Sequence, residues 1–235
     1  MEPINMPKFR HPFTMVISGS TGTGKTEWLM RFLNAMDRII EPQVQSVLYC
    51  YGEANKNTME LAKRETINAL QSGHDKNGKN TGIPVHTYNG VPSEALIKQE
   101  AAKSGGRLLL VLDDLIVNLK SEFLDPLFTR GSHNWGVSVI VVTQHLFSKE
   151  LRIARSNSHY LCLMRNPAGE LQIRNLAIQT FPLQHRYFME AYRDATAQPY
   201  SYLLVDLHPS TDNRIRLRTH IFAPDETCIV YVPKS

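Results

Sequence analysis

Short apolar runs of strand length alternate along the chain with longer segments whose apolar residues recur at helical spacing. The short runs predict strands over residues 13–18, 47–51, 85–88, 108–112, 137–143 and 160–164. The longer segments predict helices over residues 26–38, 57–70, 93–103 and 182–196. The run LLLVL is wholly apolar, as a central parallel strand requires when helices cover both faces of its sheet. The alternation therefore indicates an α/β fold with a parallel sheet flanked by helices.

Local signals predict where two of the helices begin and end. Asn57 is expected to cap the helix over residues 57–70, because a glutamate follows it three residues later. Asp125 and Pro126 are expected to cap and start a further short helix. Gly131 is expected to end that helix.

The last part of the chain has the pattern of antiparallel strands. Residues 201–207 and 214–222 flank the turn HPSTDN as the two arms of a β-hairpin, and residues 227–232 predict a last strand. No internal repeat or linker interrupts the sequence. We therefore expect a single domain over residues 1–235, with a core over about 10–180 and a C-terminal β-rich extension over about 181–235.

The composition is that of a globular protein with a modest surface charge. Of the 235 residues, 42% are hydrophobic, which is enough to bury a core and excludes a disordered tail. The 26 Lys and Arg residues against 22 Asp and Glu give a net charge of +4, without a basic run. No apolar run reaches the ~18 residues of a membrane helix, and the first residues lack the apolar block of a signal peptide. The sequence predicts an intracellular protein that is not secreted and has no transmembrane segment.

The cysteines do not predict a covalent or metal framework. Cys50, Cys162 and Cys228 are odd in number, far apart, and each lies in an apolar stretch. A disulfide framework favours an even count, and a zinc site favours a close pair such as C-x2-C. We expect small buried side chains and no structural metal.

The clearest chemical signal is the sequence GSTGTGKT, which matches the Walker A pattern G-x4-G-K-[ST]. A predicted strand precedes it and an amphipathic helix follows it, which is the setting that the motif requires. Its glycines allow successive N–H groups to surround phosphate oxygens, and the helix N-terminus adds its dipole. Lys25 would contact the β- and γ-phosphates, and the Thr26 hydroxyl would ligate Mg²⁺. The predicted nucleotide-binding residues are Gly19, Ser20, Thr21, Gly22, Thr23, Gly24, Lys25 and Thr26.

Polar residues follow two further buried strands, where a parallel sheet would bring them beside the phosphates. The run LLLVLDD ends in Asp113, which would hold Mg²⁺ as in a Walker B strand, and in Asp114, which would act as general base toward the attacking water. Gln144 follows VSVIVVT and would bond both the γ-phosphate and that water. A cap or loop role for Asp114 is the alternative.

Hydrolysis at such a site needs additional positive charge on the transition state, often from an arginine of a neighbouring subunit. Arg130, just before the strand that leads to Gln144, is the first candidate. Arg152 and Arg155, which follow that strand, are the alternatives. Ordinary exposed arginines remain an equally good explanation for all three.

Two groups of basic residues are candidates for DNA contact. Lys76 and Lys79 lie in a polar loop and would form a positive girdle if the chain assembled as a ring. Arg214, Arg216 and Arg218 share one face of a predicted strand and form the second group. A solvated surface without a nucleic-acid partner explains both groups equally well.

Together, these motifs resemble those of the DNA-packaging ATPases of the FtsK–HerA superfamily. The resemblance covers most of the chain and is carried by PFTMVISGSTGTGKTEWL, VLYCYGE, LLLVLDDL, LFTRGSH, VSVIVVTQHLF, RSNSHYLCL, PYSYLLVDLHPST and RLRTHIF. It is greatest to the ATPases of Maverick/Polinton elements and related double-jelly-roll viruses, with poxvirus and giant-virus packaging ATPases more distant. The superfamily usually has Glu where this chain has Asp114, a departure that concerns the rate rather than the reaction.

The resemblance implies an ASCE-type, RecA-like P-loop NTPase that uses ATP and Mg²⁺. It further implies a homo-oligomeric ring, a pentamer or hexamer, that translocates double-stranded DNA into a preformed capsid, with the capsid or portal vertex as partner and the host cell or virion as location. The resemblance also implies an arginine that acts on the ATP of a neighbouring subunit, and Arg130 is the residue expected in that role. Two other functions remain open: a P-loop kinase for a small molecule, for which no arginine-rich lid follows Asp113, and a non-catalytic, nucleotide-gated capsid scaffold.

Overall fold

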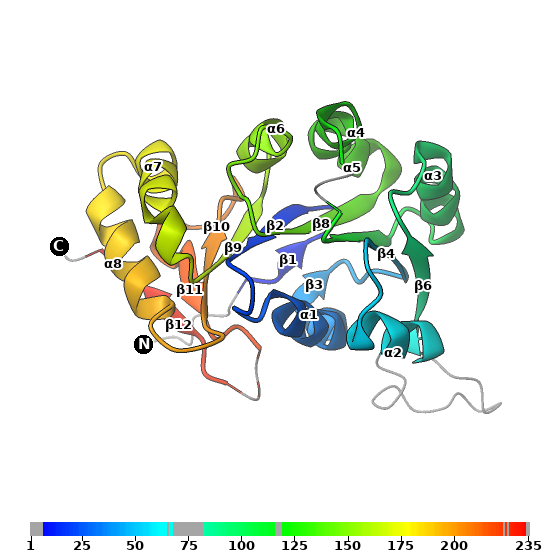
Figure 1. Cartoon of the computed structure of the whole chain (residues 1–235), viewed down its shortest axis with the longest axis horizontal. Helices are drawn as coiled ribbons and strands as arrows, with labels where there is room; N and C mark the ends of the chain where they lie inside the picture. The colour runs from blue at the N-terminus through cyan, green and yellow to red at the C-terminus, as the bar shows by residue number, and fades with distance from the viewer. Residues whose placement is uncertain are drawn as a thin grey trace.

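The computed structural model describes residues 7–64, 66–67, 82–115, 119–222, 224 and 226–233. Within them, ten strands form one sheet in the order β12-β11-β10-β9-β2-β8-β7-β4-β6-β5 (Figure 1). These strands are β2 (Thr14–Ser18), β4 (Ser46–Tyr51), β5 (Thr66–Ile67), β6 (Ile83–Asn89), β7 (Leu108–Asp113), β8 (Val137–Thr143), β9 (Tyr160–Met164), β10 (Tyr202–Asp206), β11 (Leu217–Thr219) and β12 (Ile229–Tyr231). Two short strands, β1 (Phe9–Arg10) and β3 (Ile40–Glu41), pair with each other outside this sheet.

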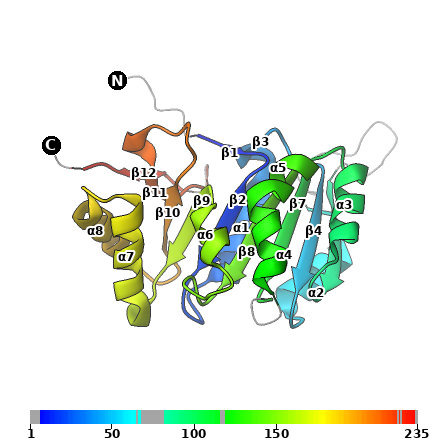
Figure 2. The same ribbon diagram turned by 90° about the horizontal axis from the view of Figure 1, so that it is seen from above.

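The centre of the sheet is parallel and covered on both faces. Strands β9, β2, β8, β7, β4 and β6 run in one direction, and every residue of β2, β7 and β8 is buried. One face is covered by α1 (Lys25–Ile39) and α2 (Lys56–Arg64) (Figure 1). The other carries α3 (Glu94–Lys103), α4 (Ser121–Pro126), α5 (Ser132–Trp135), α6 (Arg152–Ser156) and α7 (Glu170–Thr180), as Figure 2 shows. Because parallel strands share a carboxyl edge, the segments that follow β2, β7 and β8 meet there.

The strands follow the hydrophobic pattern closely. All six strands expected in the core are present, each within two residues of the predicted bounds. The expected hairpin is also confirmed, because β10 and β11 pair antiparallel and β12 pairs with β11. Since β10 in turn pairs antiparallel with β9, these C-terminal strands extend the main sheet. An α/β fold with a parallel sheet flanked by helices is therefore observed.

The helix expected over residues 57–70 begins and ends earlier than predicted. Asn55, not Asn57, caps α2: its Oδ1 accepts a hydrogen bond from the Thr58 N–H at 3.0 Å. Thr58 Oγ1 in turn accepts from the Asn55 N–H at 2.8 Å, which completes a reciprocal cap. The helix ends at Arg64 and the short strand β5 follows. The predicted cap was wrong because Thr58, three residues after Asn55, completes this reciprocal pair and starts the helix at Lys56.

The helical segment before β8 is also longer than predicted. It begins with α4, a turn before Asp125, so Asp125 and Pro126 lie inside it rather than at its start. It continues through a π-helical segment (Leu127–Gly131) into α5, so Gly131 does not end it. Gly136 does, with φ of 64° in the left-handed region that favours glycine. Buried residues such as Phe128 hold the whole segment on the sheet, and that packing outweighs the local stop signal.

The remaining helices complete the second layer. The helix expected over residues 182–196 is present as α8 (His185–Ala195), which packs beside α7 against β10 and β11. The short α6 and the helix α7 were not predicted, since only Ile173, Leu176 and Ala177 of α7 are buried. No helix within the described residues combines the length and apolar character that a membrane crossing demands. Cys50, Cys162 and Cys228 are all free thiols, the first two buried.

Lowering the pH from about 7 to about 4.5 should destabilise the fold, and His159 should account for part of the loss. The Thr14 N–H donates to Nδ1 of His159 at 3.1 Å, so that nitrogen must be unprotonated. Burial, with smaller effects of His208 and His133, lowers the pKa of His159 to about 4 from 6.5. Between these values the unfolded chain binds more protons than the folded one, so stability falls as the pH falls.

The variant His159→Asn isolates this contribution, because asparagine offers an acceptor oxygen to the Thr14 N–H but does not titrate. Urea unfolding of both proteins across this pH range should give a shallower decline for the variant. Equal declines would show that His159 does not titrate as described.

Candidate active site

The Walker A sequence forms the turn between β2 and α1. Gly22 and Gly24 have φ values of 77° and 93°, which glycine adopts without steric cost. Gly24 is the N-cap of α1, and no side chain among the described residues caps this 15-residue helix. Uncapped N–H groups and the positive end of the helix dipole are suited to an anion such as phosphate.

Lys25 folds back over this turn. Its Nζ donates hydrogen bonds to the carbonyl oxygens of Gly19 and Ser20, each at 2.8 Å. An ammonium group has three donors, so these two bonds leave one for a phosphate oxygen. Burial lowers the pKa of Lys25, while Asp114 and then Asp113 act in the opposite direction and favour its charged form.

Asp113 ends β7 at the same edge and is 5% exposed. The hydroxyl of Tyr49, on the neighbouring strand β4, donates to its Oδ2 at 2.5 Å. Burial raises the pKa of Asp113; the Tyr49 hydrogen bond and Lys25 oppose that rise, and Asp114 adds to it. Burial also raises the pKa of Tyr49, so its hydroxyl remains a donor. The arrangement holds one carboxylate in a fixed position where a cation would stabilise its ionised form.

The chain turns sharply immediately after Asp113. Asp114 has φ of 53°, which is unusual for a residue other than glycine. The turn lies against Gly52: the Gly52 N–H donates to the Asp113 carbonyl at 3.2 Å, and a methyl group on Gly52 would lie 2.9 Å from the Asp114 carbonyl oxygen. The turn leaves Asp114 exposed at the edge of the sheet, beside the buried Asp113.

Gln144 follows β8, which lies between β2 and β7. Its Oε1 accepts a hydrogen bond from the Thr21 hydroxyl at 2.8 Å, so the end of β8 is tied directly to the Walker A turn. The amide group also carries two N–H donors that can bond an oxygen in the site. Gln144 therefore stands between the expected phosphates and the carboxylates of β7.

A cleft of about 530 Å³ runs along this edge, a volume typical of small-molecule sites. The predicted residues that line it are Thr21, Gly22, Gly24, Lys25, Thr26, Asp113, Asp114 and Gln144. The other predicted loop residues support the turn: Gly19 and Ser20 hold Lys25, and the Thr23 hydroxyl donates to the Ser20 carbonyl at 2.8 Å. The structure thus brings the three sequence motifs to one site.

Seven residues that line the cleft were not predicted as site residues, and Glu53, Asn55 and Tyr200 are among them. Glu53 and Asn55 follow β4, the strand beside β7. An acidic residue after an apolar strand is the signal used for Asp113, and applied to VLYCYGE it would have found Glu53. Tyr200 precedes β10 and has no comparable signal, because only the pairing of β10 with β9 brings it to the site.

The residues present fit a magnesium ion. Thr26 and Asp113 line the same cleft and offer a hydroxyl and a carboxylate, the hard oxygen donors that Mg²⁺ prefers. Mg²⁺ is commonly held by only one or two protein groups together with substrate phosphates and water. Accordingly, the described residues contain no cluster of three or more His, Cys, Asp or Glu side chains suited to a metal.

The candidate arginines for transition-state contact lie outside the cleft of their own chain. Arg130 is exposed in the π-helical segment, and Arg152 is exposed at the start of α6. Arg155 is instead tied to the loop after Gln144: its Nη1 donates to the Leu146 carbonyl at 2.8 Å and its guanidinium lies 4.4 Å from the centre of the Phe147 ring. Arg155 therefore braces that loop, which leaves Arg130 and Arg152 as candidates for contact with a neighbouring subunit.

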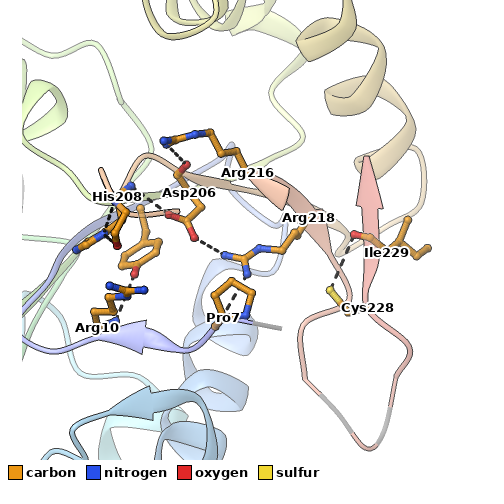
Figure 3. A network of polar contacts seen from close by, with 10 residues as sticks. Pro7, Arg10, Asp206, His208, Arg216, Arg218, Cys228 and Ile229 are labelled. Carbon is orange, nitrogen blue, oxygen red and sulfur yellow. Dashed lines mark hydrogen bonds and ion pairs between the residues drawn. The ribbon is translucent and has the colours of Figure 1, made fainter. Parts of the chain in front are cut away.

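Of the two basic groups that are candidates for DNA contact, the structure describes only the second. Lys76 and Lys79 lie outside the described residues. Arg214, Arg216 and Arg218 do not share a solvated strand face, because Arg218 is 3% exposed and pairs with Asp206 at 2.6 Å (Figure 3). Only Arg218 lies in β11 (Leu217–Thr219); Arg214 lies in a 3-10 helix (Asn213–Ile215), and Arg216 follows that helix. The buried carboxylate of Asp206 compensates the charge of Arg218.

Similarity to known proteins is found among solved structures. No protein-family model matches the chain, and no curated protein matches it. The chain is similar to the genome packaging NTPase B204 from Sulfolobus turreted icosahedral virus 2, whose structure contains AMPPCP. The two share 13% sequence identity over 94% of this chain and 98% of that chain, with a TM-score of 0.47.

Proposed function

We propose that this chain is an ATP-hydrolysing motor that translocates double-stranded DNA during packaging of a viral genome into a preformed capsid. The observation that carries the enzymatic part is the meeting of Lys25, Thr26 and Asp113 in one cleft at the carboxyl edge of the sheet. The position of β8 between β2 and β7 supports an ASCE-type, RecA-like P-loop core. The DNA and packaging part rests on the resemblance of the sequence motifs to FtsK–HerA ATPases.

In this proposal the Walker A turn and α1 bind the triphosphate. The N-terminus of α1 attracts the phosphates, and Lys25 donates its third N–H hydrogen bond to a β- or γ-phosphate oxygen. Thr26 and Asp113 are the residues that would hold Mg²⁺, which when bound neutralises charge on the phosphate oxygens. Tyr49 keeps Asp113 oriented through the hydrogen bond to Oδ2.

Hydrolysis needs a base and an orienting group on the γ-phosphate side of the cleft. A water oxygen forms a bond to the γ-phosphorus while the bond from that phosphorus to the β–γ bridging oxygen breaks, giving ADP and phosphate. Asp114 accepts the proton that the water loses. The Gln144 amide, held by Thr21, orients the water and the γ-phosphate. Arg130 of an adjacent subunit would supply further positive charge in a homo-oligomeric ring.

The variant Asp114→Asn should lower kcat for ATP about 100-fold or more while KM changes little, because general-base catalysis contributes ~10²–10⁴ in rate. Glu53→Gln is the matched control: it replaces another carboxylate of the same cleft by an amide, and it should change kcat less than about threefold on this assignment of the base. Steady-state phosphate release measures both. A larger loss of kcat in Glu53→Gln than in Asp114→Asn would instead assign the general base to Glu53, which follows β4.

The motor function is tested by ATP turnover of the purified chain with and without double-stranded DNA. A motor should show Mg²⁺-dependent turnover that DNA stimulates. Mixing Lys25→Ala subunits with Arg130→Ala subunits should restore turnover if neighbours share a site, and the same mixture with Arg152→Ala tests the alternative. ATP binding without turnover under every condition would favour a nucleotide-gated scaffold, and phosphate transfer to a small acceptor would favour a kinase.

A further inference from the structure

One aromatic side chain, that of Tyr200, lies beside the phosphate-binding turn and is largely exposed to solvent. Tyr200 precedes β10 and lines the same cleft as Lys25 and Thr26. It is 69% exposed, so most of its surface is accessible to a ligand in the cleft. Its φ of 62° lies in the left-handed region, so the chain adopts an unfavourable backbone geometry at the residue that presents this ring.

The Tyr200 side chain lies directly against the start of α1. A methyl group on Gly24 would be 2.9 Å from Cδ1 and 3.3 Å from Cβ of Tyr200. The first of these distances is shorter than carbon atoms tolerate, so the ring approaches the Walker A turn as closely as the absence of a side chain at Gly24 permits. Gly24 therefore serves two purposes, since its φ of 93° also favours glycine.

The order of the strands fixes the side of the turn on which Tyr200 lies. Tyr202 pairs with Met164, the last residue of β9, and β9 borders β2 on the side away from β8. The carboxylates and Gln144 follow β7 and β8, on the other side of β2. Tyr200 and the hydrolytic groups therefore flank the Walker A turn from opposite sides.

This geometry fixes how a nucleoside triphosphate would lie in the cleft. The γ-phosphate must face the groups that hydrolyse it, beside Asp114 and Gln144. The α-phosphate, ribose and base then extend the other way, past Gly24. The exposed ring that meets them there is that of Tyr200.

We propose that Tyr200 stacks on the nucleobase of the bound nucleotide. This inference rests on the proposed function, since it assumes that the cleft binds a nucleoside triphosphate. An aromatic ring and a nucleobase each present a flat, polarisable face, and stacking needs no particular hydrogen-bonding edge. Tyr200 then contributes to nucleotide affinity and not to the chemical step, because it is remote from the bond that breaks.

The test separates contacts to the base from contacts to the phosphates. The dissociation constants of ATP and of inorganic tripolyphosphate, which has no base, are measured by calorimetry with Mg²⁺ present. Tyr200→Ala should weaken ATP binding about 10-fold to 100-fold, the range found for base–aromatic stacking. It should leave tripolyphosphate binding unchanged, and Tyr200→Phe should behave as wild type.

Two further variants control for folding and for loss of exposed surface. Tyr200→Asn removes the ring with a residue that tolerates the left-handed region, and it should match Tyr200→Ala. Leu183→Ala truncates a side chain that is 97% exposed outside the cleft, and it should bind both ligands as wild type does.

The outcomes distinguish this inference from the proposed function. If Lys25→Ala no longer binds ATP while Tyr200→Ala and Tyr200→Asn bind ATP with wild-type affinity, the stacking role is overturned and the nucleotide site is supported. If both Tyr200 variants weaken ATP and tripolyphosphate equally, Tyr200 only supports the turn and the stacking role is again overturned. If wild type binds neither ligand, the proposed function fails and this inference fails with it.

Discussion

A Lys25→Ala variant should hydrolyse ATP at least about 100-fold more slowly than wild type, the loss typical of removing one donor to transition-state charge. The structure explains the size of this effect. Lys25 is oriented by the carbonyl oxygens of Gly19 and Ser20, so its remaining donor is directed without further ordering of the side chain. Alanine removes the charge and the donor from a partly buried site in which little water can replace them.

Two controls make the Lys25 result specific. Lys98→Ala removes an exposed lysine that pairs with Glu94 on α3, and it should retain wild-type turnover. Thermal unfolding of Lys25→Ala should stay close to that of wild type, because the substitution removes two hydrogen bonds to a surface turn and leaves the core intact. Turnover in Lys25→Ala equal to that of wild type would refute the nucleotide site itself.

The variant Arg218→Met should lose about 3–5 kcal/mol in free energy of unfolding, the usual cost of leaving one charge of a buried pair uncompensated. Arg218 and Asp206 are 3% and 1% exposed, and their contact at 2.6 Å joins β11 to β10 (Figure 3). Asp206 Oδ1 also accepts from the His208 N–H at 3.1 Å, so the carboxylate is fixed in place and cannot turn to solvent. Guanidinium chloride unfolding measures the loss.

The charge explanation is separated from loss of packing by a double variant. Asp206→Asn combined with Arg218→Met removes both buried charges and should regain part of the stability that Arg218→Met loses. Arg214→Met is the surface control: its pair with Asp212 is exposed, so no measurable change is expected. A double variant less stable than Arg218→Met would show that burial of an unpaired carboxylate is not the cause.

Strand identity could be predicted from the sequence because a parallel strand that is covered on both faces is largely apolar. LLLVL and VSVIVVT have this largely apolar pattern, and both are fully buried strands. Helix ends were predicted less well. Asn55 rather than Asn57 caps α2, because it forms a reciprocal pair with Thr58. Gly131 lies inside a helical segment that packs on the sheet.

The sequence also determined the chemical part of the candidate site. The spacing of GSTGTGKT, together with an acid or amide directly after an apolar strand, predicts which side chains gather at a carboxyl edge, because parallel strands all end there. This local rule brought Lys25, Thr26, Asp113, Asp114 and Gln144 into one cleft. The rule predicts the shared edge, and the adjacency of β2, β8 and β7 then places these ends side by side.

Only the tertiary structure decided what depends on strand order and on the direction of side chains. Tyr200 reaches the phosphate-binding turn solely because β10 pairs with β9, and Arg218 is buried solely because its strand turns that side chain toward Asp206. Such contacts join segments distant in sequence, and no local pattern encodes them. The sequence by itself determined the elements and the chemistry of their ends; packing decided which of those ends face each other, because burial is a property of the assembled sheet and not of any one segment.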